Sequence, residues 1–264
     1  MNPRTRPLQH LTGLALVAAA STASAEVVRI ATGELPPYAT AEAADSGTAL
    51  HIVRRAFALA GHEVRYQFMP WQRAQNETRA GLWDASAYWG ANEERRRDFL
   101  LSNNVMSEQW VFVHRRDKAL TWRSLTDLKP YTLGVIKGYT YTPEFWSLAR
   151  KGELRTDGTP DDLAGLRKLL LGRLDAMPME RGTACYLLMS HFSPEEARQI
   201  DYHPRLLTDS FTTHVIFPRD KLRSPQLLED FNRGLKQLQA SGEYQRLLRG
   251  VACPPHWQES ASRH

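Results

Sequence analysis

The stretch DASAYWGANEERRRDF, residues 84–99, runs an apolar strand directly into a dense cluster of charges. Its first half is small and aromatic, as in a strand that is buried on both faces. After the turn Gly90-Ala91-Asn92 come two glutamates and the run Arg95-Arg96-Arg97. The simplest interpretation of this run is the solvated start of a helix. The alternative is that one arginine binds an anion at the end of the buried strand.

The elements that precede this stretch alternate between strands and helices. Leu50, Val53 and Phe57 recur at helical spacing, whereas Val64 and Phe68 belong to an alternating strand. The pattern predicts strands at 27–32, 64–68 and 82–88, and helices at about 48–60 and 70–80. This order indicates a parallel sheet with helices on its faces, which is an α/β fold.

The same alternation restarts after residue 110. Thr142-Pro143 and Thr159-Pro160 each look like a capping hydroxyl followed by proline at the first helical position. Strands are predicted at 111–113, 131–136, 174–177 and 212–217, and helices at about 142–152, 159–172 and 224–242. The chain therefore holds a second unit of similar architecture. Ordered strands must join the two, because nothing between them resembles a flexible linker.

Ligands in open parallel sheets bind beyond the carboxyl ends of the strands. The segments 33–38, 68–73, 88–97, 138–142 and 177–181 occupy such ends. They are rich in aromatic residues: Tyr38, Trp71, Tyr88, Trp89, Tyr139 and Tyr141. For one such ring, core packing is the ordinary interpretation, but several at strand ends favour a stacking pocket.

Charged residues also follow these strand ends. The guanidinium of Arg95 can grip a carboxylate through two parallel hydrogen bonds. Glu180 follows the predicted strand 174–177 and can take an ammonium group. The turn Gly138-Tyr139-Thr140 can offer backbone N–H groups to an anion. At least two of the three arginines at 95–97 are expected to be exposed to solvent.

The first 25 residues look like a cleaved signal peptide. Arg4 and Arg6 are basic, Leu11–Ala20 is apolar but too short to span a bilayer, and Ala23-Ser24-Ala25 fits a cleavage site before Glu26. The alternative is a buried N-terminal helix. The signal-peptide interpretation predicts that the mature protein acts in the periplasm.

Charge and cysteine content narrow the class of partner. The formal net charge is +5 and the isoelectric point is about 9.3, which is a mild bias towards anionic ligands. Nucleic acid is not expected, because no lysine-rich stripe or nucleic-acid-binding motif is present. No metal or cofactor is expected either. Cys185 and Cys253 can form a disulfide in an oxidising compartment, or remain buried free thiols.

Several short segments, in their order and spacing, carry a family resemblance. They are PPY at 36–38, PWQRA at 70–74, DA at 84–85, NEERRRDFLLS at 92–102, DLK at 127–129, GVIKG at 134–138, GRLDA at 172–176 and FNRGLKQLQASGEY at 231–244. The chain resembles the bacterial extracellular solute-binding proteins of family 3, the amino-acid receptors of ABC importers.

The resemblance implies a two-lobed fold of the periplasmic-binding-protein type II. Each lobe would be a mostly parallel sheet flanked by helices, and two crossing strands would join the lobes and allow hinge closure. Lobe one would comprise 26–112 and 213–264, and lobe two 113–212. The expected protein is a monomer that binds an amino acid or related small carboxylate and delivers it to an inner-membrane ABC permease.

The resemblance also implies roles for single residues. Arg95 matches the arginine that grips the ligand α-carboxylate, with Arg96 as the alternative if the loop is shifted by one. Glu180 matches the acid that holds the α-ammonium, and Asn92 replaces a usual threonine. The other expected ligand-binding residues are Tyr38, Trp71, Tyr88, Trp89, Gly138 and Thr140. Tyr88 and Trp89 stand where smaller polar residues are common, which predicts a narrower pocket or a different solute.

Two other functions fit the same fold. Cyclohexadienyl dehydratases resemble these receptors, and Glu180 is then the candidate general acid. Neither a nucleophile–base pair nor a metal-ligand cluster stands out in the sequence, so binding without catalysis is expected. A soluble partner of a signalling receptor is the third possibility.

Overall fold

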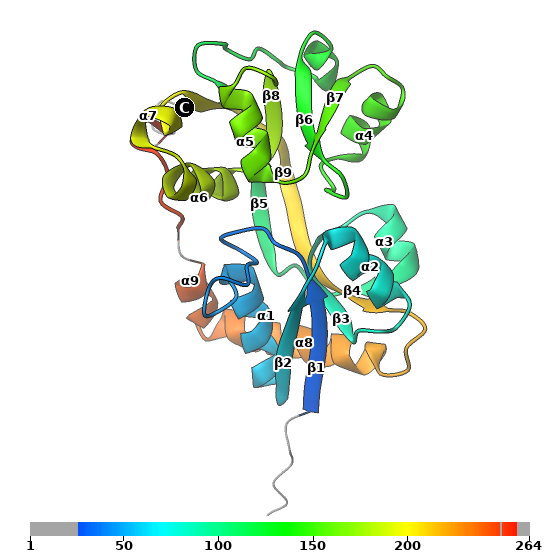
Figure 1. Cartoon of the computed structure of the whole chain (residues 1–264). Coiled ribbons are helices and arrows are strands. Elements are labelled where there is room, and N and C mark those ends of the chain that lie inside the picture. Colours follow the sequence, from blue (N-terminus) through cyan, green and yellow to red (C-terminus); the bar gives the residue numbers. More distant parts are fainter. Residues whose placement is uncertain (1–25, 249, 258–264) are drawn as a thin grey trace, which may run out of the picture.

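The computed structural model describes residues 26–248 and 250–257, so the expected signal peptide at 1–25 lies outside the described residues. Two lobes lie one above the other, and two long strands run between them (Figure 1). In the described residues a mixed nine-stranded sheet passes through both lobes in the order β2-β1-β3-β9-β5-β8-β6-β7, with β4 paired to β9. The two-lobed α/β fold predicted from the sequence is confirmed.

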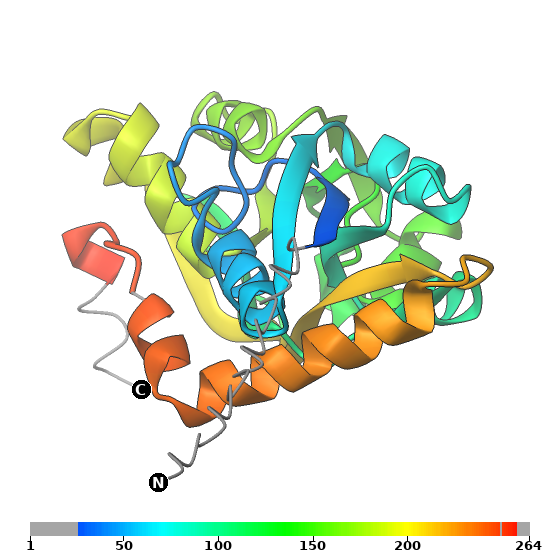
Figure 2. The ribbon, with the colours of Figure 1, turned by 90° about the horizontal axis from the view of Figure 1, so that it is seen from below.

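The first lobe is built on parallel strands. β1 (Glu26–Thr32) lies between β2 (His62–Phe68) and β3 (Ala85–Gly90). Its other elements are α1 (Thr48–Leu59), α2 (Trp71–Arg79), α3 (Glu93–Asp98), β4 (Phe99–Leu101), α8 (Ser224–Ala240) and α9 (Glu243–Leu247). Seen from below, α8 lies lengthwise along the lobe beside α1 (Figure 2).

The apolar stripe of α8 explains this placement. Leu227, Phe231, Leu235 and Leu238 recur every three or four residues and are buried in the core of the first lobe. The ring centroid of Phe231 lies 5.0 Å from that of Phe57 on α1. The core of this lobe therefore depends on a helix that follows the whole second lobe in sequence.

The second lobe repeats the parallel arrangement. β6 (Thr132–Ile136) lies between β8 (Ala176–Glu180) and β7 (Arg155–Thr159). Its other elements are η1 (Leu125–Leu128), α4 (Pro143–Arg150), α5 (Asp162–Leu170), α6 (Arg181–His191) and α7 (Pro194–Ala197). Thr142 caps α4 as predicted, with its side chain accepting a hydrogen bond from Phe145 N at 3.1 Å.

The predicted cap of α5 is wrong. Asp161 accepts a hydrogen bond from Ala164 N at 2.7 Å and caps the helix, whereas Thr159 ends β7. The acid competes successfully for the cap because its carboxylate accepts from the free N–H groups and also interacts favourably with the helix dipole.

The two joining strands are longer than the sequence pattern suggested. β5 (Met106–Arg115) and β9 (Ile200–Pro218) pair antiparallel along nearly the full length of β5. Thr213 pairs with Gly90 on one side and with Met106 on the other. The expected lobe boundaries at 112/113 and 212/213 fall inside these two strands, and the division into lobes at those residues stays a prediction.

The C-terminal segment returns to the second lobe. Cys253 forms a disulfide with Cys185 on α6, which settles the alternative between paired and free cysteines. The ring of Trp257 packs on Tyr202 at 4.7 Å between centroids, and its Nε1 donates to the Ile200 carbonyl at 3.1 Å. The chain therefore connects the lobes at this segment as well as through β5 and β9.

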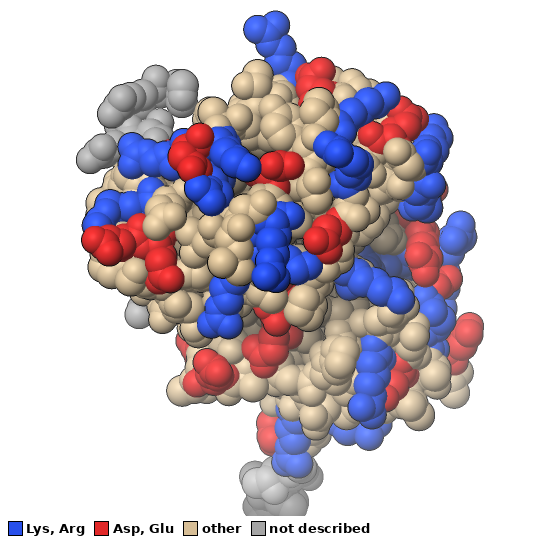
Figure 3. Space-filling view, turned by 45° about the horizontal axis from the view of Figure 1, so that its top comes forward, with Lys and Arg blue, Asp and Glu red and all other residues tan. Residues whose placement is uncertain are grey.

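The surface mixes charges of both signs. On the face shown in Figure 3, lysines and arginines alternate with acids over both lobes instead of forming one basic field. In the part of the chain that the structure describes, no helix is both long and apolar enough to cross a membrane.

Candidate functional site

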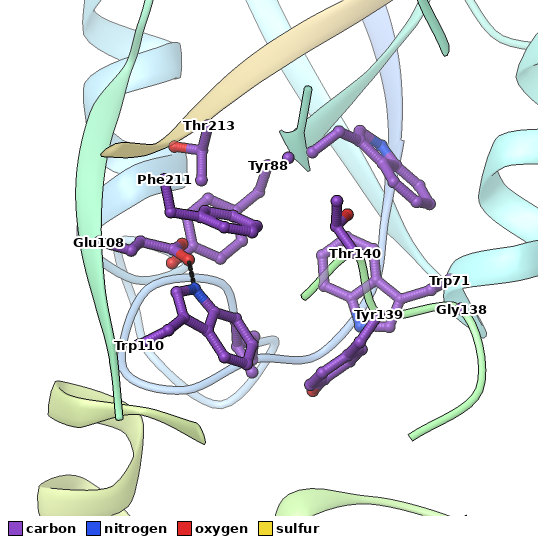
Figure 4. A pocket seen from close by; sticks show the side chains of 12 residues that line it. Trp71, Tyr88, Glu108, Trp110, Gly138, Tyr139, Thr140, Phe211 and Thr213 are labelled. Atoms are coloured by element: carbon purple, nitrogen blue, oxygen red, sulfur yellow. Dashed lines mark hydrogen bonds between the residues drawn. The ribbon is translucent and has the colours of Figure 1, made fainter. Parts of the chain in front are cut away.

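A pocket lies between the lobes, and both lobes and the joining strands line it (Figure 4). We call it the cleft pocket. It is lined by Leu35, Trp71, Tyr88, Trp89, Gly90, Glu108, Trp110, Gly138, Tyr139, Thr140, Phe211 and Thr213. It is small, with room for only a few waters. A solute the size of an amino acid can enter only if the lobes or these side chains move apart.

Aromatic rings form most of the wall. Trp71 meets Trp89 edge-on at 5.1 Å between centroids. Trp110 lies 5.3 Å from Phe211 and 5.9 Å from Tyr139. Such rings present large apolar faces, and their electron-rich faces also attract cations.

The end of β3 is bent so that its rings reach the pocket. Tyr88 has a φ of 72°, in the left-handed region that bulky residues rarely adopt. The register of β3 against β9 shifts between Ser86 and Trp89, so the chain forms an irregularity at this point. Bulges of this kind re-aim side chains beside functional sites. A non-glycine residue in this region costs about 1–3 kcal/mol, and such residues cluster at functional sites.

Gly90 lets the second lobe approach this strand end. A Cβ at this position would lie 2.5 Å from the Phe211 ring and 2.9 Å from Thr140 Oγ1. Cβ atoms are almost never found this close to another atom, so with any other residue the Phe211 ring and Thr140 would have to shift. The absence of a side chain at Gly90 therefore makes room for Phe211 and Thr140 at this strand end.

Arg95 bridges the two lobes beside the cleft pocket. Its Nη1 donates to the Gly90 carbonyl at 2.9 Å and to Thr140 Oγ1 at 2.6 Å, and its Nε donates to Gln75 Oε1 at 2.9 Å. The guanidinium lies 4.5 Å from the Trp89 ring centroid. Only 5% of the residue is exposed, and burial lowers the pKa of its guanidinium to about 10.

The local fold holds Arg95 in this place. Asn92 caps the N-terminus of α3, because its Oδ1 accepts from Arg95 N at 2.7 Å. Arg96 and Arg97 are exposed, as expected for two members of the run. Arg95 lines an outer cavity that adjoins the cleft pocket, and the two share Trp89, Gly138, Tyr139 and Thr140.

Glu180 and Tyr38 lie together, but outside the lining of the cleft pocket. Glu180 ends β8 and caps α6, and its Oε2 accepts from Thr183 N at 2.7 Å. Both residues line a neighbouring cavity between the lobes. Burial raises the pKa of both side chains, and the Glu180 carboxylate raises that of Tyr38 further. The other predicted ligand-binding residues lie closer to the cleft pocket. Arg95 lines the adjoining outer cavity, and the cleft pocket itself is lined by Trp71, Tyr88, Trp89, Gly138 and Thr140.

Glu108 is the residue that the sequence reasoning missed. It lies on β5, is 4% exposed, and accepts from Trp110 Nε1 at 2.7 Å through Oε2 (Figure 4). Burial, and then the negative charge of Glu180, raise the pKa of its carboxyl to about 8. The signal that could have found it is the strand-like alternation of Met106-Ser107-Glu108-Gln109-Trp110. In the structure Met106, Glu108 and Trp110 are buried, whereas Ser107 and Gln109 are exposed.

Comparison with known proteins places the chain in a family. Residues 28–250 match the profile of the bacterial extracellular solute-binding proteins, family 3. The chain belongs to this family. A search of curated proteins found no match.

Solved structures share the fold of this family 3 protein. A histidine kinase sensor domain with similarity to periplasmic binding proteins has a TM-score of 0.72 at 17% identity, over 88% of this chain and 99% of that one. An ancestral arginine-binding protein bound to arginine has a TM-score of 0.69 at 16% identity, over 85% and 97%. An amino acid ABC transporter substrate-binding protein from Streptococcus pneumoniae, bound to L-arginine, has a TM-score of 0.68 at 17% identity, over 84% and 92%.

Proposed function

We propose that this family 3 protein is a periplasmic receptor that closes on an amino acid or a related small carboxylate. It would deliver this solute, as a monomer, to an inner-membrane ABC permease. The buried guanidinium of Arg95 is the observation that carries the proposal. Among the described residues no carboxylate lies within ion-pair distance of it, although buried charges are ordinarily paired. A carboxylate ligand would supply the missing negative charge.

The position of Arg95 suits a ligand that is held by both lobes. The guanidinium projects from α3 in the first lobe and meets Thr140 in the second. A carboxylate at this junction would be shared by the two lobes, so binding would favour the closed arrangement over the open one. Trp71, Tyr88 and Trp89 would then pack on the rest of the ligand.

Calorimetry with a panel of amino acids and small carboxylates tests the proposal. Replacing Arg95 by glutamine should weaken the binding of every carboxylate ligand at least tenfold, because a charged hydrogen-bond pair contributes about 1.5–3 kcal/mol. Arg97→Ala is the matched control, since Arg97 belongs to the same run but is exposed. Equal affinities in the Arg95→Gln variant and the parent, with both proteins folded by circular dichroism, would count against the site.

A dehydratase is the second candidate function, and Glu108 favours it. With a pKa near 8, this buried carboxyl keeps its proton at neutral pH, as a general acid must. Glu180 fits that role less well, because it already accepts a backbone hydrogen bond at the start of α6. Incubation with prephenate or arogenate separates the two functions: an aromatic product indicates the enzyme, and binding without turnover indicates the receptor.

A further inference from the structure

The outer cavity that adjoins the cleft pocket is much the larger of the two. It lies between the lobes, and its walls are α2 and α3 of the first lobe, the turn at 138–140, and α4 of the second lobe. These helices lie on the same side of the molecule (Figure 1). A ligand that reaches Arg95 therefore has space beyond the cleft pocket.

The unused donor of Arg95 belongs to this outer cavity. Arg95 is part of the lining of the outer cavity and not of the cleft pocket. Its Nη1 and Nε donate to Gly90, Thr140 and Gln75, whereas its Nη2 donates to no atom of the described residues. An anionic group can therefore approach this guanidinium from the side of the outer cavity.

A second guanidinium without an acidic partner lines the same cavity from the other lobe. Arg150 is exposed in the last turn of α4. It forms no ion pair with any residue that the structure describes, and Glu153, the acid nearest to it in sequence, pairs with Lys129 Nζ at 2.8 Å. Each lobe therefore contributes one arginine whose charge no acid of the described chain neutralises.

The remaining charges of the lining do not change this balance. Arg79 Nη2 pairs with Glu94 at 3.4 Å and with Asp98 at 2.8 Å. Glu93 is the other acid of the lining, and it is exposed in the first turn of α3. With three arginines against two glutamates, the outer cavity keeps a net positive charge.

Trp146 fixes α4 against the turn that contacts Arg95. Its Nε1 donates to the Tyr139 carbonyl at 2.9 Å, and its ring stacks on Tyr141 at 5.3 Å between centroids. Arg150 follows four residues later, on the same side of the helix. The position of Arg150 is therefore tied to the turn on which Arg95 rests.

The two free arginines are separated along α4. Arg95 is bonded to Thr140, which lies just before the start of this helix at Pro143. An α-helix rises 1.5 Å per residue, so Arg150 lies about 10 Å along the axis from Pro143. A ligand in contact with both guanidiniums has to be elongated.

We propose that the outer cavity takes an elongated dianion, with one anionic group at Arg95 and a second at Arg150. This inference rests on the proposed function and names its ligand class as molecules that carry a carboxylate at each end. Guanidinium groups suit carboxylates because they can donate two parallel hydrogen bonds. Since the two arginines belong to different lobes, the second charge would also favour the closed arrangement. Arg150 is then a specificity-determining residue.

Two series of probes that differ only in the second charge test the inference. Straight-chain dicarboxylates from succinate to azelate are compared by calorimetry with the monocarboxylates of equal carbon number. The advantage of the dianion should be small for succinate, which is too short, and should reach about tenfold or more at a greater length, as expected for a charged hydrogen-bond pair. An advantage that is absent or the same at every length overturns the inference, and so does a lack of binding by every probe.

Arg150→Gln assigns the second anionic group to this residue. The variant should bind the best dicarboxylate about tenfold more weakly, and the monocarboxylate of equal length within about twofold of the parent. Arg173→Gln is the matched control, since Arg173 is also an exposed arginine of the second lobe but lies outside the lining of the cavity. An unchanged advantage of the dianion in Arg150→Gln overturns the role of Arg150.

The failures of this inference and of the proposed function differ. If Arg95→Gln weakens both series while chain length and Arg150→Gln have no effect, the carboxylate receptor stands and the inference about the outer cavity fails. If Arg95→Gln leaves the affinity of both series unchanged, the carboxylate site of the proposed function fails, and this inference fails with it.

Discussion

Glu108 couples the stability of the empty protein to pH. Its pKa is about 8 in the folded protein, against an ordinary value of 4.5, and burial also raises the pKa of Asp162 to about 7. The folded protein therefore keeps protons that the unfolded chain releases near the ordinary pKa values of 4.5 for glutamate and 3.8 for aspartate. Consequently, stability from these groups is fully present at low pH and is lost as the pH rises towards 8.

Replacing Glu108 by glutamine should remove part of this dependence. At pH 9 the variant no longer buries an ionised carboxylate, so its free energy of unfolding should exceed that of the parent by about 1–3 kcal/mol. At pH 5, where the parent carboxyl is protonated, the two should be similar. Urea unfolding of both proteins at the two pH values measures the difference. An equal difference at pH 5 and pH 9 would contradict the assignment.

Gly90 controls how closely the lobes meet. In Gly90→Ala the new methyl would contact the Phe211 ring and Thr140, so the closed arrangement should be disfavoured and ligand affinity should fall about tenfold or more. Small-angle X-ray scattering should show a larger radius of gyration with ligand than in the parent. Gly158→Ala is the control, because nothing lies within 4 Å of the position of its Cβ. An unchanged affinity in Gly90→Ala would refute this role.

The sequence predicted the site more fully for residues at strand ends than for residues within strands. Trp71, Trp89 and Thr140 follow predicted strands, so the topology alone brings them together. Glu108 was missed because the predicted strand began at Val111, and an acid outside a strand looks like a solvated loop residue. The positive φ of Tyr88 could not be predicted either, because no glycine or asparagine at that position signals it in the sequence.

At the scale of elements, the short helix α3 determines the position of Arg95. Asn92→Ala removes the side chain that accepts from Arg95 N. The helix start should loosen, at a cost of about 1 kcal/mol, and carboxylate affinity should fall several-fold. Asn92→Thr should restore both, because threonine also caps. Calorimetry and thermal unfolding of the two variants measure this, and a threonine variant as weak as the alanine variant would exclude capping as the cause.

Most elements with a regular apolar pattern were predicted, whereas β7 and the first half of β9 were not. β1, α1 and α8 carry regular apolar spacing because one side of each faces a core. β7 (Arg155–Thr159) was missed because it is an edge strand whose residues are mostly exposed, so burial imposes no alternation on it. The first half of β9 was missed for a similar reason: Asp201, Arg205 and Pro204 interrupt any apolar pattern there.

At the scale of the whole molecule, the disulfide fixes the C-terminal segment to the second lobe. Cys185 and Cys253 are 68 residues apart, so the crosslink restricts a large part of the unfolded chain. Replacing both by serine should lower the free energy of unfolding by about 2–4 kcal/mol. Guanidinium unfolding measures this. Reductant should destabilise the parent similarly and leave the double variant unchanged; a parent insensitive to complete reduction would contradict the prediction.

This crosslink also sets a limit on the hinge. The end of α9 at Leu247, on the first lobe, is six residues from Cys253 on the second. A chain of that length spans at most about 20 Å when fully extended. Whatever motion the two lobes undergo, these two points cannot separate beyond that reach, so the crosslink restricts opening on the side of the molecule where the C-terminal segment lies.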